Sequence, residues 1–437
     1  MHRPRPVTAL LVEGFASRLS FGVLTFALPL YALQLGMSIA AIGFLSAFAG
    51  IVSVSLKPVT GTFADRWGVR RTLLAALMAR SLLCLGYVVA TAPAQLFAVR
   101  GVHGVSDALR DPAVHAMIAE NGSKRSMAST FAWYQTAKTT AGSLGKTLAG
   151  LLLATTLGFP LAFTVAFGLS LLPVFFIAAA MRPRVREQTG IKTLPPPQEP
   201  PSRGDVPAEP SGHPPGTLAY AALGFLVAGT ASMLNALFPI LATEYAGLST
   251  AQAGLVYLLG PAAALTGPVW GWVADRVSRP LVLAVRGVAN VTSSLVYLVA
   301  PNPVGVWSGK ALDDVGKAAF RPAWGSLMAD VANRDPRTRA RAMGYLTAGE
   351  DAGTIVAPIA AGLLWTYWGI PVLLLARIVV AAVSEVYSLR LERRQRRWRD
   401  AESSASDASR RLSDANAARS PGRSDVAPPR PTPPECR

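Results

Sequence analysis

Ionisable side chains recur at helical spacing in an otherwise apolar segment, residues 94–119. Arg100, His103, Asp107 and Asp111 are separated by three, four and four positions. This spacing places all four side chains on one face of an α-helix. Charges within an apolar helix are costly unless they are paired or hydrated, and in membrane proteins they mark paths for protons, ions or polar substrates. The residue types therefore suggest charge pairing and proton or substrate handling.

A second segment, residues 303–329, carries charges at corresponding positions. They follow the first set at an offset of 210 residues and comprise Lys310, Asp313, Lys317 and Arg321. Lys317 corresponds to Asp107 and Arg321 corresponds to Asp111, so at both positions the charge in the second segment is opposite to that in the first. We predict that Asp107 and Lys317 form an ion pair across an interface between two halves of the protein.

Two adjacent carboxylates, Glu350 and Asp351, are candidates for proton transfer. They lie about 12 Å inside an apolar segment that starts near residue 342, at a helical rise of about 1.5 Å per residue. Adjacent carboxylates in a poorly hydrated site repel each other, so one of them can take up and release a proton. Lys138 lies at a similar depth in another apolar segment. The alternative is a static pair between Lys138 or Lys146 and one of these carboxylates.

Simpler interpretations remain open for several of these charges. Arg100 and Lys310 lie only a few residues inside their segments, so their side chains could extend to the outer membrane surface. Asp107, Asp111 and Lys317 could form a static ion pair that holds the two halves together. Five further charged residues are interpreted as packing or interfacial residues: Lys57, Arg80, Arg286, Arg377 and Glu385.

The elements that must position these residues are membrane-spanning helices. Of the 437 residues, 51% are apolar and 15% are charged, whereas soluble proteins carry about 25% charged residues. The net charge of +17 would suit a nucleic-acid-binding protein, but the uncharged stretches are too long for one. Apolar runs of about 18 or more residues predict twelve spans. We place them at residues 7–30, 39–60, 70–91, 94–119, 127–153, 159–181, 217–240, 248–271, 280–300, 303–329, 342–366 and 369–390.

The connections between the predicted spans differ sharply in charge. Every second connection, like both ends of the chain, is rich in Lys and Arg, whereas Glu244 is the only charged residue in the other six. Because basic loops stay in the cytoplasm, we expect both termini to be cytoplasmic and the protein to reside in the inner (plasma) membrane of the cell. No metal-ligand cluster or nucleophile motif occurs, so we expect no cofactor, no metal and no enzymatic activity.

The composition divides the chain into two bundles, a linker and a tail. Residues 182–216 contain ten prolines and predict an extended cytoplasmic linker. It separates an N-terminal six-helix bundle, residues 1–181, from a C-terminal six-helix bundle, residues 217–390. Residues 391–437 predict a basic, disordered cytoplasmic tail.

An internal repeat relates the two bundles. Residues 57–66 align with residues 267–276, and six of the ten positions are identical. The first copy lies within the motif Gly-Thr-Phe-Ala-Asp-Arg-Trp-Gly-Val-Arg-Arg, residues 61–71. This motif resembles the cytoplasmic signature between the second and third spans of the major facilitator superfamily. The weaker second copy lies at the equivalent position between the eighth and ninth spans.

The resemblance implies an all-α membrane fold of twelve transmembrane helices in two six-helix bundles, with a conformational gate at the motif. We expect Asp65 to cap a helix start and to pair with basic residues across this gate. The gate residues that the resemblance implies are Gly61, Asp65, Arg66, Gly68, Arg70, Arg71, Gly271, Asp275 and Arg276.

Two further motifs resemble sequences of the same family. Leu96-x-x-x-Arg100-x-x-His103-Gly104 is similar to a fourth-span motif whose arginine serves in proton coupling or substrate binding, although Gln is more usual at the position of His103. By the same resemblance the first, fourth, seventh and tenth spans line a cavity, which places Arg18 there. The series Gly353, Ala357, Pro358, Ala361 and Gly362 is similar to the fifth-span signature of drug–proton antiporters, but it lies in the eleventh span.

Taken together, these features predict a secondary-active transporter that exports small organic molecules in exchange for protons by alternating access. One alternative is a proton-coupled uptake permease for a small anionic solute, which the many intramembrane cations would suit. Another is a receptor or scaffold that does not transport. The expected partners are a small-molecule substrate, protons and membrane lipids, with no nucleic acid, and the expected state is a monomer.

Overall fold

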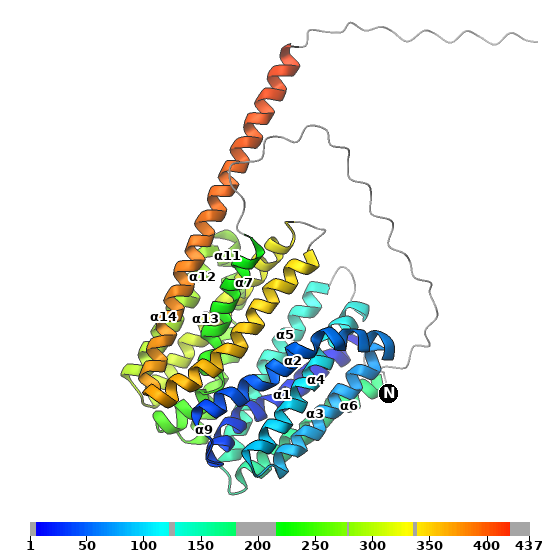
Figure 1. The fold of residues 1–437 in the computed structure, drawn as a ribbon, viewed down its shortest axis with the longest axis vertical. Helices are drawn as coiled ribbons and strands as arrows, with labels where there is room; N and C mark the ends of the chain where they lie inside the picture. Colours follow the sequence, from blue (N-terminus) through cyan, green and yellow to red (C-terminus); the bar gives the residue numbers. More distant parts are fainter. Residues whose placement is uncertain (1–5, 122–126, 181–215, 278, 335–338, 420–437) are drawn as a thin grey trace, which may run out of the picture. The chain divides into compact units, whose positions relative to one another are not determined.

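The computed structural model describes residues 6–121, 127–180, 216–277, 279–334 and 339–419. Every long element in the N-terminal half is a helix, and the short turns between these helices lie at residues that the sequence marks as breaks (Figure 1). The six helices are α1 (Pro6–Gln34), α2 (Ile39–Trp67), α3 (Val69–Val89), α4 (Pro93–Asn121), α5 (Met127–Leu153) and α6 (Gly158–Ala180).

The C-terminal half is less regular than the sequence predicts. The seventh predicted span is helical only to Asn235 and continues as short pieces, and the eighth is broken three times. The elements up to α11 are α7 (Thr217–Asn235), α8 (Phe238–Ile240), the π-helix η1 (Leu241–Tyr245), α9 (Thr250–Leu255), the 3-10 helix η2 (Val256–Leu258), α10 (Leu259–Ala264) and α11 (Gly267–Arg276). The remaining helices are α12 (Arg279–Val299), α13 (Pro303–Ala332) and α14 (Arg339–Arg419).

The helix α14 contains the last two predicted spans. They meet at Gly369, whose φ of 80° is a conformation that favours glycine, and the chain turns there between two helical parts. The helix continues to Arg419, so the predicted disorder of the tail is wrong for residues 391–419. Residues 420–437 and the predicted linker at 182–215 lie outside the described residues.

Within the described residues, 6 helices are long and apolar enough to cross a membrane, or up to 7 if the bent pair α9–α10 and α11 forms one span. This count treats α14 as a single helix. The helices α4, α5 and α13 carry most of the candidate charges, which lowers their mean hydropathy. Large apolar side chains are exposed on the outer surface, for example Leu82 at 66%, Phe175 at 70% and Val288 at 64%, as expected for helices surrounded by lipid.

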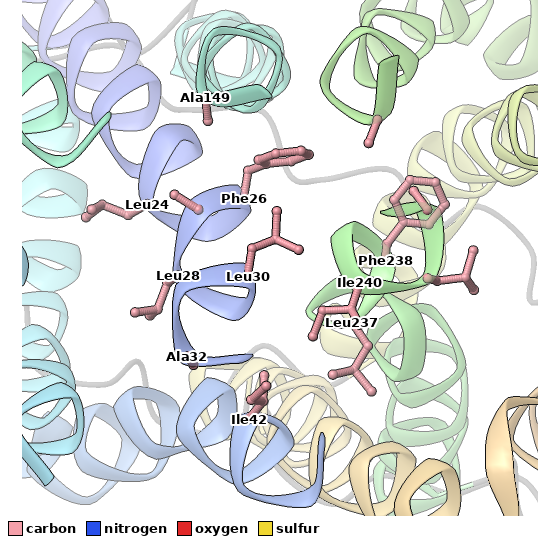
Figure 2. Close-up of a cluster of buried hydrophobic side chains, with 14 of the residues drawn as sticks. Leu24, Phe26, Leu28, Leu30, Ala32, Ile42, Ala149, Leu237, Phe238 and Ile240 are labelled. Carbon is pink, nitrogen blue, oxygen red and sulfur yellow. The ribbon is translucent and has the colours of Figure 1, made fainter. Parts of the chain in front are cut away.

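The described helices as far as Leu389 form one compact unit, and the segment from Arg390 belongs to a second unit. Within the first unit, the largest apolar cluster joins both halves at one end. This end, here called the short-loop end, carries the connections at 35–38, 90–92, 154–157, 246–249 and 300–302. Figure 2 shows Phe26 and Leu30 of α1 pointing toward Leu237, Phe238 and Ile240 of the other half. At the opposite end the described residues form one apolar cluster around Leu73 and Tyr134 and another around Val282 and Ala319.

Glycines allow the two halves to approach each other closely at two places. Between α5 and α9, a Cβ atom on Gly150 would lie 2.6 Å from the Cα of Gly254, and Thr147 Oγ1 donates a hydrogen bond to the carbonyl of Gly254 at 3.0 Å. Between α2 and α14, a Cβ atom on Gly43 would lie 3.1 Å from the Cα of Gly362. Side chains larger than hydrogen would force the halves apart at both places.

Candidate functional site

The C-terminal half contains a cluster of buried charges centred on Asp313 of α13. Its Oδ1 accepts hydrogen bonds from Arg377 Nη2 at 2.9 Å and from Arg286 Nη1 at 3.3 Å, and its Oδ2 accepts one from Lys317 Nζ at 2.5 Å. Asp313 is 6% exposed and Arg377 only 1%. Because the three cations come from α12, α13 and α14, the carboxylate ties three helices together.

A second group in this half is centred on the next residue of α13, Asp314, and shares Lys317 with the first. Lys310 and Lys317 both pair with Asp314, which lies four residues from the first and three from the second. Arg321, a further turn along, is exposed and donates a hydrogen bond to Thr139 Oγ1 of α5 at 2.9 Å, so it crosses to the other half. The charged face that the sequence predicts on this helix is therefore present, but its lysines are paired with aspartates of the same helix.

In the N-terminal half, Arg80 of α3 holds the corresponding central position. Its Nη2 donates to Asp107 Oδ1 at 3.0 Å and lies 3.1 Å from His103 Nε2, and its Nη1 donates to Ser17 Oγ of α1 at 3.0 Å. Arg80 and His103 are buried, whereas the Asp107 side chain is 29% exposed. The group links α1, α3 and α4 and leaves one carboxylate partly accessible.

Glu13 and Arg110 form a second buried ion pair in this half, which the sequence did not single out. Arg110 Nη2 lies 2.7 Å from Glu13 Oε1, and Tyr134 Oη of α5 donates to Glu13 Oε2 at 3.2 Å. Arg110 also lies 3.4 Å from the half-exposed carboxylate of Asp111. Both residues are charged and lie within predicted spans, and this signal in the sequence could have identified them.

Several predicted pairings are wrong in this conformation. Asp107 pairs with Arg80 and Lys317 with Asp313, so the predicted Asp107–Lys317 pair does not form. The interpretation of Arg80, Arg286, Arg377 and Lys57 as packing or interfacial residues is also wrong, since all four form ion pairs. The three arginines pair with a carboxylate on an adjacent helix of their own half, Lys317 pairs on its own helix, and Lys57 pairs on α14.

The adjacent carboxylates of α14 have different partners. Glu350 Oε1 accepts a hydrogen bond from the Trp324 indole nitrogen at 2.8 Å, and no described cation pairs with it. Asp351 Oδ2 lies 2.6 Å from Lys57 Nζ of α2, so this ion pair joins the two halves. The static pairs that we considered between Lys138 or Lys146 and these carboxylates are not present in the described structure.

We expect the Lys57–Asp351 pair to make a small contribution to stability, because both side chains are about one-third exposed (37% and 32%). Lys57→Met or Asp351→Asn should each lower the free energy of unfolding by about 1 kcal/mol or less. The charge-swapped double variant, Lys57→Asp with Asp351→Lys, should recover that loss. Thermal unfolding in detergent measures both effects. If the charge-swapped variant loses as much stability as the two single variants added together, the pair does not stabilise this conformation.

The gate motif is only partly described. The side chains of residues 61–65 and of Asp275 lie outside the description, so the predicted gate contacts of Asp65 are not tested. The prediction that Asp65 caps a helix start is wrong, because α2 continues to Trp67 and Gly68, with φ of 85°, precedes α3. Arg70 Nη2 donates to the carbonyl of Ala178 in α6 at 3.1 Å. Gly271 lies within α11, and Arg66, Arg71 and Arg276 are exposed.

The remaining candidate cations have diverse surroundings. Arg100 is 9% exposed and donates to the carbonyls of Leu45 and Ser46 in α2 at 3.4 and 3.3 Å, so it does not extend to the membrane surface. Arg18 contacts the Phe21 ring and Lys138 contacts the Tyr134 ring. Among the described residues there is no group of three or more His, Cys, Asp or Glu side chains that could hold a metal ion.

The sequence profile of the Major Facilitator Superfamily matches residues 10–308 and 220–422, which together cover most of the chain. The chain belongs to the major facilitator superfamily. Membership makes it a multi-pass integral membrane protein and a secondary transporter of a small-molecule substrate, not an enzyme. The predicted family is therefore confirmed.

Solved structures agree with the family in fold. The nucleoside transporter NupG superposes with a TM-score of 0.67 at 15% identity, covering 90% of this chain and 99% of that one. An inward-facing, unoccupied bacterial homologue of the human lysosomal transporter Spinster superposes with a TM-score of 0.69 at 13% identity, covering 90% of this chain and 97% of that one.

A sequence relative, the multidrug resistance protein MdtG of Escherichia fergusonii, is 27% identical over 140 residues. The match covers 31% of this chain and spans about a third (34%) of the length of that relative. It is a distant relationship within the family.

Proposed function

We propose that the protein is a proton-coupled exporter of small organic molecules that works by alternating access. In this proposal twelve helical spans form two bundles, residues 1–181 and 217–390, and both termini lie in the cytoplasm of a cell whose inner membrane holds the protein as a monomer. The basic connections favour this orientation. The distant match to a multidrug resistance protein supports export over uptake.

The packing of the halves supports alternating access. A single apolar cluster joins them at the short-loop end, whereas each half has its own cluster at the opposite end. With the termini in the cytoplasm, the described conformation is closed toward the outside. The gate motif, residues 61–71 and 271–276, then lies at the end where the halves must approach each other when the transporter turns over.

The observation that supports proton coupling is the ion pair between Lys57 and Asp351. This pair joins the halves directly beside Glu350, a carboxylate that pairs with no cation in the described part of the chain. Glu350 has one described polar partner, the Trp324 indole. Protonation at Glu350 or Asp351 would alter the charge at the contact between α2 and α14, so proton binding and movement of the halves are linked there.

We expect Glu350→Gln and Asp351→Asn, made singly, to separate proton coupling from substrate transport. Proteoliposomes with an imposed pH gradient and an internal pH dye would be tested with a panel of small organic solutes. The coupling variant should exchange substrate between the two sides but should lose the proton movement that accompanies it. Glu244→Gln, an exposed carboxyl in η1, is the matched control.

The same measurement decides between the candidate functions. Protons that move opposite to the solute support export by exchange, and protons that move with the solute support the uptake permease. If both variants respond to the pH gradient like the wild type, the coupling carboxylates are elsewhere. Absence of flux for all solutes would favour a receptor or scaffold.

A further inference from the structure

Several buried cations in the described helices pair with carboxylates, and Arg100 donates to backbone carbonyls, but three partly buried cations of the N-terminal half have neither kind of partner among the described residues. Arg18 of α1 and Lys138 and Lys146 of α5 form no ion pair with a carboxylate anywhere in the described part of the chain. The acids of this half whose side chains the structure describes are already engaged, since Glu13 and Asp111 pair with Arg110, and Asp107 pairs with Arg80. The half therefore carries positive charge in excess.

Each of these three cations lies over an aromatic ring. The Arg18 guanidinium is 4.8 Å from the centre of the Phe21 ring, and the Lys138 ammonium is 5.2 Å from that of Tyr134. The Lys146 ammonium is 4.6 Å from the centre of the Tyr257 ring. Such contacts stabilise a cation without neutralising its charge. The three side chains remain partly accessible, so they can still bind an anion.

The contacts of α5 place two of these cations beside the other half. Tyr257 belongs to η2, and its ring also lies 5.2 Å from the ammonium of Lys310 on α13. One ring thus lies between a lysine of each half. Thr139, the residue after Lys138, accepts the hydrogen bond from Arg321 of α13. Lys310 is paired with Asp314, whereas Lys146 has no such partner among the described residues.

Like and opposite charges both act on the two lysines. Lys146 experiences the like charges of Lys310 and Lys317 and the opposite charge of Asp314. Lys138 experiences the like charges of Arg18 and Arg110 and the opposite charges of Asp111 and Glu13, which are already paired with Arg110. A poorly hydrated region with several uncompensated cations favours a ligand of opposite charge. Of the aromatic rings beside the cations, Phe21 is partly exposed and would provide apolar surface for the body of that ligand, whereas Tyr134 and Tyr257 are buried.

We propose that Arg18 and Lys146 bind the acidic group of an organic anion, and that Lys138, about two helical turns from Lys146 on α5, adds to the positive potential of the site. The ligand class is a small molecule with an apolar or aromatic body and a carboxylate, phosphate or sulfate group. This proposal rests on the proposed transport function and specifies its substrate class. Anion binding can be tested in detergent without a pH gradient. The test can therefore refute anion binding while proton coupling stands, and loss of proton coupling would not refute anion binding.

The first test needs no ligand. Lys146→Met keeps the length of the side chain but removes an uncompensated charge, so the melting temperature of the purified protein should stay the same or rise. Lys317→Met, the matched variant, removes a cation that pairs with Asp313 and Asp314, so its melting temperature should fall. If Lys146→Met lowers the melting temperature as much as Lys317→Met does, Lys146 serves a structural pair and the proposal is overturned.

The second test uses solutes in matched sets, each skeleton supplied as its carboxylate, its alcohol and its amine: the naphthalene, indole and octane series. Carboxylates should raise the melting temperature, whereas the alcohols and amines should not. Lys146→Met and Arg18→Gln should each weaken the apparent affinity about tenfold or more, which corresponds to the loss of one charged contact. Arg341→Gln, an exposed arginine that contacts Tyr345, should bind like the wild type. Stabilisation by none of the carboxylates, or equal stabilisation by the amines, would overturn the proposal.

Discussion

Replacing Asp313 by asparagine is expected to lower the free energy of unfolding by about 3–5 kcal/mol, the usual cost of removing one partner of a buried ion pair. The carboxylate is the shared acceptor of Arg286, Arg377 and Lys317, at 3.3, 2.9 and 2.5 Å. The variant would leave two arginines that are 3% and 1% exposed without a carboxylate. Because they come from α12 and α14, the loss should loosen the C-terminal half and also abolish transport.

Chemical and thermal unfolding of the purified protein in detergent would measure this effect. Asp111→Asn is the matched control, since the Asp111 side chain is 46% exposed and Arg110 keeps Glu13 as its partner. That variant should change the free energy of unfolding by about 1 kcal/mol or less. If the two variants unfold alike, the Asp313 cluster does not anchor these helices.

The second large effect is expected for Gly254→Leu, which should reduce the transport rate by about an order of magnitude or more. A Cβ atom at this position would lie 2.8 Å from the Cα of Gly150 and 3.1 Å from the carbonyl oxygen of Thr147, and a leucine adds three further carbons. The halves could then no longer close at the short-loop end. The packing within each half is not touched, so the protein should still fold and insert into the membrane.

Initial transport rates in proteoliposomes and the melting temperature in detergent test this prediction together. The matched control is Gly168→Leu, because a Cβ atom on Gly168 of α6 has nothing within 4 Å. It should transport and melt like the wild type. Wild-type transport by Gly254→Leu would show that the contact between α5 and α9 opens and closes without close approach of the two glycines.

The helices of the N-terminal half were largely predictable, because long apolar runs separated by glycine, proline and short polar turns specify helix limits locally. The predicted span at 127–153 coincides with α5 (Met127–Leu153), and the break near Gly369 was also visible in the sequence. The broken helices between Asn235 and Gly267 were not predictable. Pro239, Pro261 and Pro268 lie in the first turns of α8, α10 and α11 and disfavour one continuous helix. The course of the short pieces, however, depends on how α8, α9 and α10 pack against α1, α5 and α13, which these prolines do not specify.

The partners of the buried charges were not predictable for a related reason. Repeat symmetry relates Arg80 to Asn290 at an offset of 210. It relates Arg377 to Ala166 at the offset of 211 that also relates Gly369 to Gly158, so the two halves supply their central arginine from different helices. In the structure Asn290 Oδ1 instead accepts a hydrogen bond from Arg377 Nη2 at 2.9 Å. Matching positions thus predicted which helix faces are polar, but the rotation and packing of neighbouring helices decide which charges meet.

The apolar cluster at the short-loop end has a consequence for the temperature dependence of transport. Opening that end exposes Phe26, Leu30, Phe238 and their neighbours to water, and hydration of apolar surface raises the heat capacity. Separating Lys57 from Asp351 exposes little apolar surface. The free-energy difference between the two states of the transporter should therefore depend on temperature along a curve rather than a straight line. Cooling should destabilise the conformation that the apolar cluster holds closed.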